Sequence, residues 1–287
     1  KICKILLVIL AIFLCVAFYE LLGICVAYKK QPEVSNTTKK ETKNGSWNEC
    51  SENTERAVII EKNPEALLQR VRLIKNAKKE IILSTFAFQS DESGKLILGA
   101  LHDAADRGVH IRLLVDGMES WIDMEGNPYF YGLSSHENVE IKLYNKANPL
   151  KPWKMMGRMH DKYLIADGKR YILGGRNTYN YFLGDFPGHK NYDRDVLVVC
   201  DEPEKENSVN QLLEYFETIW EQEDSGYFHD NKKLANRKSV KNAVLELQNG
   251  YQKYFEENKE RICDTDYTDE TFETEKIALV SNPIHTG

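Results

Sequence analysis

The chain has 287 residues, of which 42% are hydrophobic and 29% are charged, and its formal net charge is −6 at pH 7. A chain of this length can bury the core of one domain or of one and a half. The acidic balance excludes a generally basic surface, so we expect no nucleic acid to bind through its phosphates without regard to sequence. A local basic pocket remains compatible with this charge.

An apolar segment lies near the N-terminus. Residues 5–28 contain a single charged residue, Glu20, and lysines stand on both sides of the segment. A helix of this length crosses a hydrocarbon core of about 30 Å. A cleaved signal peptide would have a shorter apolar core and small residues at its cleavage point. We therefore interpret residues 1–30 as one uncleaved transmembrane anchor.

The anchor leaves two questions open. Glu20 is either a functional intramembrane carboxylate or a tolerated residue, and we favour the second reading because the sequence offers no second span for it to face. The flanking charges do not fix the orientation of the anchor. An extracytoplasmic catalytic domain is our preferred arrangement.

A polar linker follows the anchor. Residues 31–56 are rich in Lys, Glu, Asn, Thr and Ser, a composition typical of a tether. We expect the folded domain to occupy residues 57–224. Cys50 and Cys263 could form a disulfide in an oxidising compartment, and the sequence leaves this open.

Helices and strands alternate through the domain. Asn63 and Pro64 predict the cap and first position of a helix. The apolar run 81–88 predicts a buried strand, residues 94–106 a helix, and residues 109–115 a second strand. This strand–helix–strand order predicts a parallel crossover. Further elements are expected over 139–144 and 193–200 (strands) and over 208–221 (helix).

The segment after the domain differs in composition. Residues 240–262 predict a long helix interrupted at Asn249-Gly250, and the acidic residues of 264–275 predict a solvated linker. We therefore expect 225–276 to be a helical and acidic connector. The fold class predicted for the whole is α/β: a mixed, largely buried β-sheet flanked by helices and preceded by one transmembrane helix.

One short segment carries the candidate chemistry. Residues 158–167 read RMHDKYLIAD, and GGRN follows at 174–177. In an extended chain His160 and Lys162 share one face, about 6.6 Å apart, while Met159, Asp161 and Tyr163 share the other. An imidazole can act as nucleophile or proton donor, and a lysine supplies charge for phosphate oxygens. The alternative is a surface strand with a hydrogen-bonded histidine and a solvated lysine.

The complete pattern favours the first interpretation. H-x-K-x-x-x-x-D followed after six residues by G-G-x-N resembles the signature of the phospholipase D superfamily. The helix–strand–helix–strand of residues 63–116 also resembles the first repeat of this family, as does the segment from Tyr192 to Val196, and the similarity covers roughly residues 58–221. The anchor and the first-repeat sequence are most similar to bacterial cardiolipin-synthase-like members. Gly175 stands where many members have Ser.

The resemblance implies a fold and a chemistry. In this family one histidine attacks phosphorus to form a phosphohistidine, a second protonates the leaving alcohol, and no metal or other cofactor is needed. It implies His160 as nucleophile or general acid, Lys162 and Asn177 as phosphate-binding groups, and Asp167 as the group that holds the charges of the site in place. The backbone of Gly174 and Gly175 would add anion-binding groups.

One departure from the family pattern has consequences. Family sites use two facing motifs, whereas His160 is the only histidine here with a lysine two residues on. Either two copies of the chain pair their motifs, or residues 277–287 begin a second repeat that is cut short; we favour the second. We expect phosphatidyl transfer or phospholipid hydrolysis by the whole protein and no activity from this fragment alone.

Other residues have weaker claims. Arg158 and Arg176 could contact a head group or pair with Asp193 or Asp195. The segment with Trp121, Tyr129, Phe130 and Tyr131 could line a lipid channel or form a packed loop. Residues 151–156 could lie at a membrane surface. The rival functions are a nuclease of the same superfamily and a non-catalytic membrane-anchored interaction protein.

Overall fold

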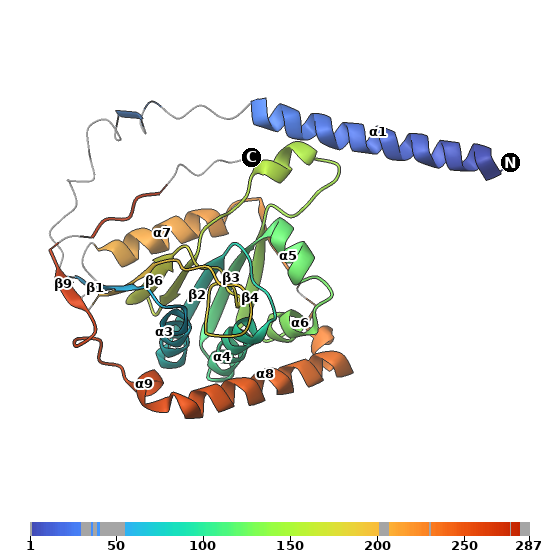
Figure 1. Cartoon of the computed structure of the whole chain (residues 1–287). Coiled ribbons are helices and arrows are strands. Elements are labelled where there is room, and N and C mark those ends of the chain that lie inside the picture. Colours follow the sequence, from blue (N-terminus) through green and yellow to red (C-terminus); the bar gives the residue numbers. More distant parts are fainter. Residues whose placement is uncertain are drawn as a thin grey trace.

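The computed structural model describes residues 2–29, 36, 39–40, 55–200, 207–229, 231–275 and 277–281. The strands of this part are β1 (Glu55–Ile60), β2 (Glu80–Thr85), β3 (His110–Asp116), β4 (Val139–Tyr144), β5 (Tyr163–Ala166), β6 (Arg170–Gly174), β7 (Asp195–Val199), β8 (Ser225–Tyr227) and β9 (Phe272–Thr274). They form one sheet in the order β8-β4-β3-β2-β5-β6-β7-β1-β9 (Figure 1).

Helices cover both faces of the sheet. The helices are α1 (Ile2–Lys29), α3 (Asn63–Asn76), α4 (Glu92–Asp106), α5 (Gly117–Asp123), α6 (Pro128–Ser134), α7 (Ser208–Trp220), α8 (Lys238–Glu257) and α9 (Lys259–Cys263), with the 3₁₀ helices η2 (Pro152–Met156) and η3 (Lys232–Asn236). One core cluster joins the sheet to α3, α4, α6 and α8, and a second joins its other face to α7. The predicted mixed α/β fold is confirmed.

Both parallel and antiparallel pairs contribute to the sheet. β2, β3 and β4 are parallel, with Glu80 opposite His110, so the predicted crossover through α4 is confirmed. β5 runs antiparallel to β2, with Ile81 opposite Ala166 and Ser84 opposite Tyr163. The start of β5 therefore lies beside the ends of the parallel strands. This arrangement decides where the motif residues gather.

A buried charge cluster holds the end of β6 against the start of β7. The Asp195 carboxylate pairs with Arg70 at 2.9 Å and with Arg176 at 3.2 Å, and all three side chains are buried. A Cβ atom on Gly174 would lie 2.1 Å from the Asp195 carboxylate, so this position requires glycine. Arg176 also donates to the carbonyls of Ile60 and Glu61.

The helix predicted at Asn63 has a different start. Lys62 occupies the cap position and has no side-chain cap bond, while Pro64 lies in the first turn as expected. The Asn63 side chain instead donates to the Asn191 carbonyl and accepts from Arg176. The hydrogen bond from the buried and distant Arg176 thus takes precedence over the local preference of Asn63 for the cap position.

Residues 225–275 belong to the same packing unit. β8 and β9 form the two edges of the sheet, and α8 packs on α4 and α6 without a break at Asn249-Gly250. The acidic segment is held by Arg72, whose guanidinium pairs with Asp264 and Glu270. The boundary predicted at residue 224 therefore does not separate two packing units. Residues 277–281 form no strand and lie against α7, where Leu279 donates to Gln211.

The apolar N-terminal segment forms α1, which extends away from the domain (Figure 1). Within the described residues it is the one helix long and apolar enough to cross a membrane. Its last part contacts η2: Tyr19 donates to the Leu150 carbonyl at 3.0 Å, and Gly23 lies against Pro152. Glu20 lines a cavity between α1 and α5, so the domain gives it a surface to face. The expected 31–56 linker and Cys50 lie largely outside the described residues, and Cys263 is exposed.

We predict that Asp195→Ala lowers the free energy of unfolding of the full chain by about 3–5 kcal/mol, because two buried guanidinium groups lose their counter-charge. Denaturant titration of the detergent-solubilised chain measures this. The control is Glu61→Ala, which breaks an exposed pair with Arg194 and should cost less than about 1 kcal/mol. Equal losses in the two variants would contradict the role of Asp195.

Candidate active site

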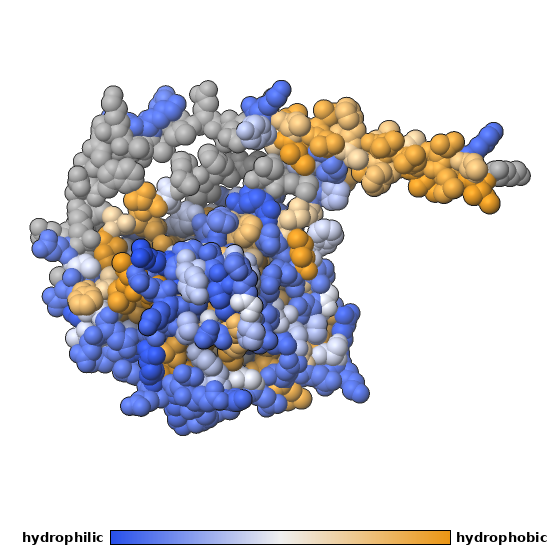
Figure 2. Space-filling view, in the orientation of Figure 1, coloured by the Kyte–Doolittle hydropathy of each residue, from blue (hydrophilic) through white to orange (hydrophobic). Residues whose placement is uncertain are grey.

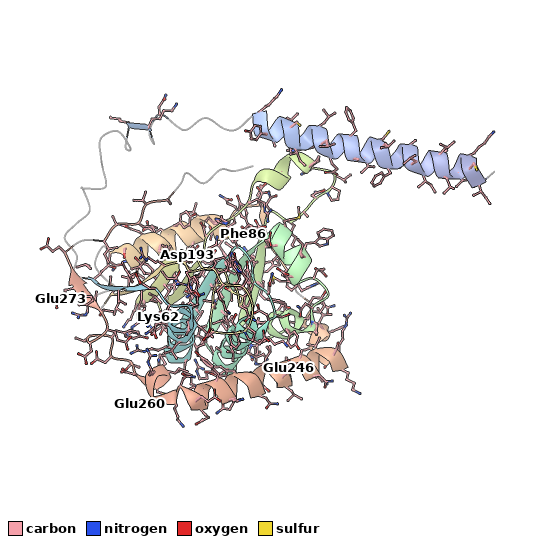
Figure 3. All side chains as sticks on the ribbon, viewed as in Figure 1. Lys62, Phe86, Asp193, Glu246, Glu260 and Glu273 are labelled. Atoms are coloured by element: carbon pink, nitrogen blue, oxygen red, sulfur yellow. The ribbon has the colours of Figure 1, made fainter. Side chains whose placement is uncertain are left out.

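The motif residues other than Asp167 lie at the end of the sheet where the parallel strands finish. β2, β3 and β4 finish here, β5 begins, and β6 finishes beside the start of β7. The carboxyl ends of parallel strands are the common place for ligand binding in open α/β sheets. Figure 3 labels Phe86 and Asp193, which follow β2 and precede β7 at this edge.

Phe86 organises the two principal motif residues. The His160 ring meets the Phe86 ring edge-on, with centroids 4.7 Å apart. The Lys162 ammonium lies 5.2 Å from the same ring centroid and donates to the His160 carbonyl. Lys162 is buried, whereas His160 is exposed at the rim. The structure thus brings His160 and Lys162 together as the extended pattern predicted, although both precede β5.

Burial sets the protonation of both groups. Burial lowers the pKa of Lys162 to about 8, against the opposing pull of Asp161, Asp193 and Asp116. Partial desolvation and the Lys162 charge lower the pKa of His160 below its ordinary value. At neutral pH the imidazole is therefore mainly neutral, with a lone pair available, while most Lys162 side chains carry a charge. A nucleophile beside a cation suits attack on an anionic phosphodiester.

The other face of the motif packs as predicted. Met159 and Tyr163 enter the α7 core cluster, and Asp161 accepts a 2.9 Å hydrogen bond from Tyr215 of α7. Burial raises the pKa of Asp161. Residues 159 and 161 therefore hold the segment against α7, so that residues 160 and 162 face the site.

Asn177 is buried next to the end of β2. Its side-chain oxygen accepts from the Ala87 amide at 3.2 Å, which leaves its NH₂ group as the available donor. The two glycines are used differently from our expectation. The Gly174 amide donates to the Lys162 carbonyl and the Gly175 amide to the Arg194 carbonyl, so neither is free for an anion. Their small size is what the site needs, because a Cβ atom on Gly175 would lie 2.1 Å from the Asp193 carboxylate.

Asp167 lies at the opposite end of β5 from His160. It occupies the hairpin turn with a φ of 54°, a conformation that Asp tolerates better than most residues. Its carboxylate accepts hydrogen bonds from the amides of Lys78, Lys79 and Glu80, at 2.7 to 3.1 Å. The expectation that Asp167 holds the charges of the site is thus corrected. It closes the turn that leads into β2.

Asp116 is a site residue that our motif analysis did not single out. Its buried carboxylate binds the Arg158 guanidinium at 2.6 Å and the Met159 amide at 3.1 Å. It also caps α5 by accepting from the Met118 and Glu119 amides. A polar residue at the end of a buried parallel strand is the sequence signal that could have identified it. Arg176 pairs with Asp195, whereas Arg158 pairs with Asp116 and Glu119.

The remaining candidates separate by burial. Phe130 and Tyr131 are core residues, as the packed-loop alternative predicted, whereas Trp121 is exposed on α5. In the segment before the motif, Pro152 is buried against α1 and Trp153 is exposed. Neither segment contacts His160 through any interaction recorded for the described residues.

Comparisons with known proteins identify the family of the chain. Residues 70–220 match the family "Cardiolipin synthase, PLD-like domain". The chain is 30% identical over 212 residues to an uncharacterized protein of Helicobacter pylori (strain J99), a match that covers 69% of this chain and 39% of that protein. It is 29% identical over 171 residues to cardiolipin synthase C of Escherichia coli, covering 55% of this chain and 34% of the relative.

The chain belongs to the phospholipase D superfamily. The family identified from the motif is therefore confirmed. The solved phosphatidylserine synthase of Haemophilus influenzae shares the fold, with a TM-score of 0.50, 17% identity, and coverage of 77% of this chain and 48% of that one. The chain thus spans less than half of the length of each of these three relatives.

We predict that Asp167→Ala lowers the free energy of unfolding by about 2–3 kcal/mol, because three backbone amides lose a charged acceptor. Asp167→Asn keeps one acceptor oxygen and tolerates the positive φ, so it should cost about half as much. Denaturant titration gives both values. A hundredfold fall in the activity of folded Asp167→Asn protein would instead place this residue among the reacting groups.

We also predict an alkaline limit set by Lys162. As pH rises through about 8 the ammonium loses its charge, so kcat/KM for a soluble phosphodiester should fall about tenfold per pH unit. Lys162→Arg, measured on the intact gene product, should move this fall to higher pH because guanidinium stays charged. Lys169→Arg, on the exposed hairpin, is the control. An unchanged alkaline limit in Lys162→Arg would exclude Lys162 as its source.

Proposed function

We propose that this chain is the catalytic half of a membrane-anchored phospholipase D-type enzyme that cleaves phospholipid phosphodiesters. The observation that carries the proposal is a neutral, rim-exposed His160 held beside the buried Lys162 charge, at the end of β2 where Asn177 binds the Ala87 amide. The family match to cardiolipin synthase supports phosphatidyl transfer or phospholipid hydrolysis as the reaction.

The chemistry has two displacement steps. The His160 imidazole attacks phosphorus and forms a P–N bond, while the P–O bond to the leaving alcohol breaks. Lys162 and Asn177 stabilise the charge on the phosphoryl oxygens. A proton from a second group neutralises the departing alkoxide. Water or another alcohol then attacks the phosphohistidine and gives its proton to the second group, the P–N bond breaks, and neutral His160 is regenerated.

The second group comes from outside this motif. In the described residues the faces of Lys162 and Asn177 are covered by the domain, whereas His160 is open at the rim. A second H-x-K motif, from another segment of the polypeptide or from a second copy, would complete the site there. The isolated chain is then inactive as a monomer. α1 supplies the membrane anchor.

The test is lipid mass spectrometry on phosphatidylglycerol vesicles incubated with the intact gene product. We expect cardiolipin if an alcohol resolves the intermediate, or phosphatidic acid if water does. His160→Ala should lose more than about a thousandfold in rate, because it removes the nucleophile. The purified 287-residue chain, kept monomeric, should form neither product.

The matched control is His110→Ala. His110 is the first residue of β3, at the end of the strands opposite to the site, and pairs with Glu140 at 3.0 Å. It should keep full activity. A folded intact protein that converts no lipid would refute the proposal, and the same variants would then be assayed on DNA phosphodiesters.

A further inference from the structure

An exposed apolar surface adjoins α1. On α5, Trp121 and Ile122 are 65% and 67% exposed, and before η2, Leu150 is 78% exposed. Single exposed apolar residues are normal, but a contiguous patch indicates a binding surface. α5 and residues 146–149 line one cavity of about 540 Å³ together with Glu20 and Ile24 of α1. Figure 2 shows hydrophobic surface over α5 and along the whole of α1.

The contact with α1 fixes where this apolar surface lies along the length of that helix. Tyr19 meets the Leu150 carbonyl, and Gly23 meets Pro152. Tyr19 lies about ten residues, or about 15 Å, before the end of α1 at Lys29. α1 has 28 residues, about eight more than a hydrocarbon core of about 30 Å requires. When its C-terminal end extends past the core, Leu150 and Trp153 lie near the membrane surface. Tryptophan is the residue typical of the membrane–water interface.

A basic corner completes the same side of the domain. η3 and the start of α8 carry exposed cations without a single acid over residues 231–241. In Figure 1 this end of α8 points to the side toward which α1 extends, next to α6. Lys232 donates to the carbonyls of Ser134 and His136. The other four cations form no ion pair with any described residue; they are Lys233, Arg237, Lys238 and Lys241.

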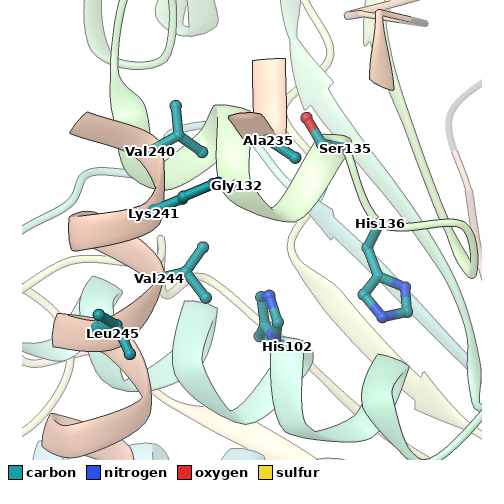
Figure 4. A pocket seen from close by; sticks show the side chains of 9 residues that line it. All are labelled: His102, Gly132, Ser135, His136, Ala235, Val240, Lys241, Val244 and Leu245. Atoms are coloured by element: carbon teal, nitrogen blue, oxygen red, sulfur yellow. The ribbon is translucent and has the colours of Figure 1, made fainter. Parts of the chain in front are cut away.

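A hollow opens beside this corner. A cavity of about 460 Å³ lies between α4, α6 and α8, lined by Lys241 and by the apolar side chains of Val240, Val244 and Leu245 (Figure 4). His102 and His136 form its polar side, and both are held by Asp106 at 3.1 and 3.2 Å. Positive charge at the rim and apolar walls inside match an anionic amphiphile.

We propose that this side of the domain, formed by α5, residues 147–153 and the corner at residues 231–241, docks on a bilayer that contains anionic phospholipid. Unpaired cations near an anionic membrane each contribute about 1 kcal/mol. The apolar tips bury themselves among the head groups. A nucleic acid would use the cations but would leave Trp121 and Leu150 exposed to water. The proposal rests on the membrane anchor of the proposed function.

The test is hydrogen exchange on the full chain, reconstituted in nanodiscs of phosphatidylcholine with or without phosphatidylglycerol. We expect amides of residues 231–241 to exchange at least about fivefold more slowly when phosphatidylglycerol is present, and the difference to shrink with added salt. Lys233→Gln/Lys238→Gln/Lys241→Gln should abolish this difference. Lys78→Gln/Lys253→Gln/Lys259→Gln changes the net charge equally at exposed positions elsewhere and should retain it.

The apolar tips are tested by brominated acyl chains in the same nanodiscs. In a chain that carries Trp47→Phe, the further change Trp121→Phe/Trp153→Phe should lose most of the tryptophan quenching, because the remaining Trp220 is buried in the domain. Equal exchange with and without phosphatidylglycerol, or unchanged quenching in the double variant, would overturn the proposal. So would protection of residues 231–241 by double-stranded DNA in place of lipid.

The outcome is separable from that of the proposed function. Failure of the chain to float with vesicles refutes the anchor and the docking surface together. Lipid conversion that depends on His160, measured alongside, tests catalysis whether or not the domain docks. The lysine variants leave every group proposed for the reaction in place.

Discussion

The antiparallel pairing of β5 with β2 is the constraint on which the site depends. Because β5 reverses the direction of the parallel strands, its first residues lie where β2 and β3 end. His160 and Lys162 thereby reach Phe86, and Asp116 reaches Arg158. A parallel β5 would begin at the opposite end of the sheet. It would place His160 and Lys162 beside the turn that Asp167 now closes. The direction of one central strand thus places His160 and Lys162 at one end of the sheet and Asp167 at the other.

Period-two alternation explains how much of the site could be predicted. Residues 160 and 162 face the site while residues 159, 161 and 163 face α7, since neighbouring side chains of an extended chain point oppositely. Alternation is a local property, so it can be read from a sequence. The destination of Asp167 was not local: its partners are amides of residues 78–80, nearly ninety positions earlier in the chain. A motif spacing records that an aspartate is needed without recording what it binds.

Long-range pairing also explains where the structure differs from the fold predicted from the sequence. Asn63 has the sequence of a helix cap, but the buried guanidinium of Arg176 takes its side chain. The acidic run after residue 263 has the composition of a linker, yet Arg72 and Arg56 hold it against the domain. In both cases an arginine distant in sequence decides the outcome. The strands and helices themselves followed their apolar periodicity, because burial against the sheet acts on each element separately.

Asp116 joins two parts of the molecule that would otherwise be independent. One carboxylate ends β3, begins α5, and holds the backbone one residue before His160. A shift of α5 would therefore reach the backbone next to His160 through a single side chain. Such coupling acts equally in both directions. On the proposed function, a ligand on the outer surface of α5 that displaced Asp116 would change the affinity of the site for a phosphodiester, and an occupied site would in turn change how firmly α5 is held.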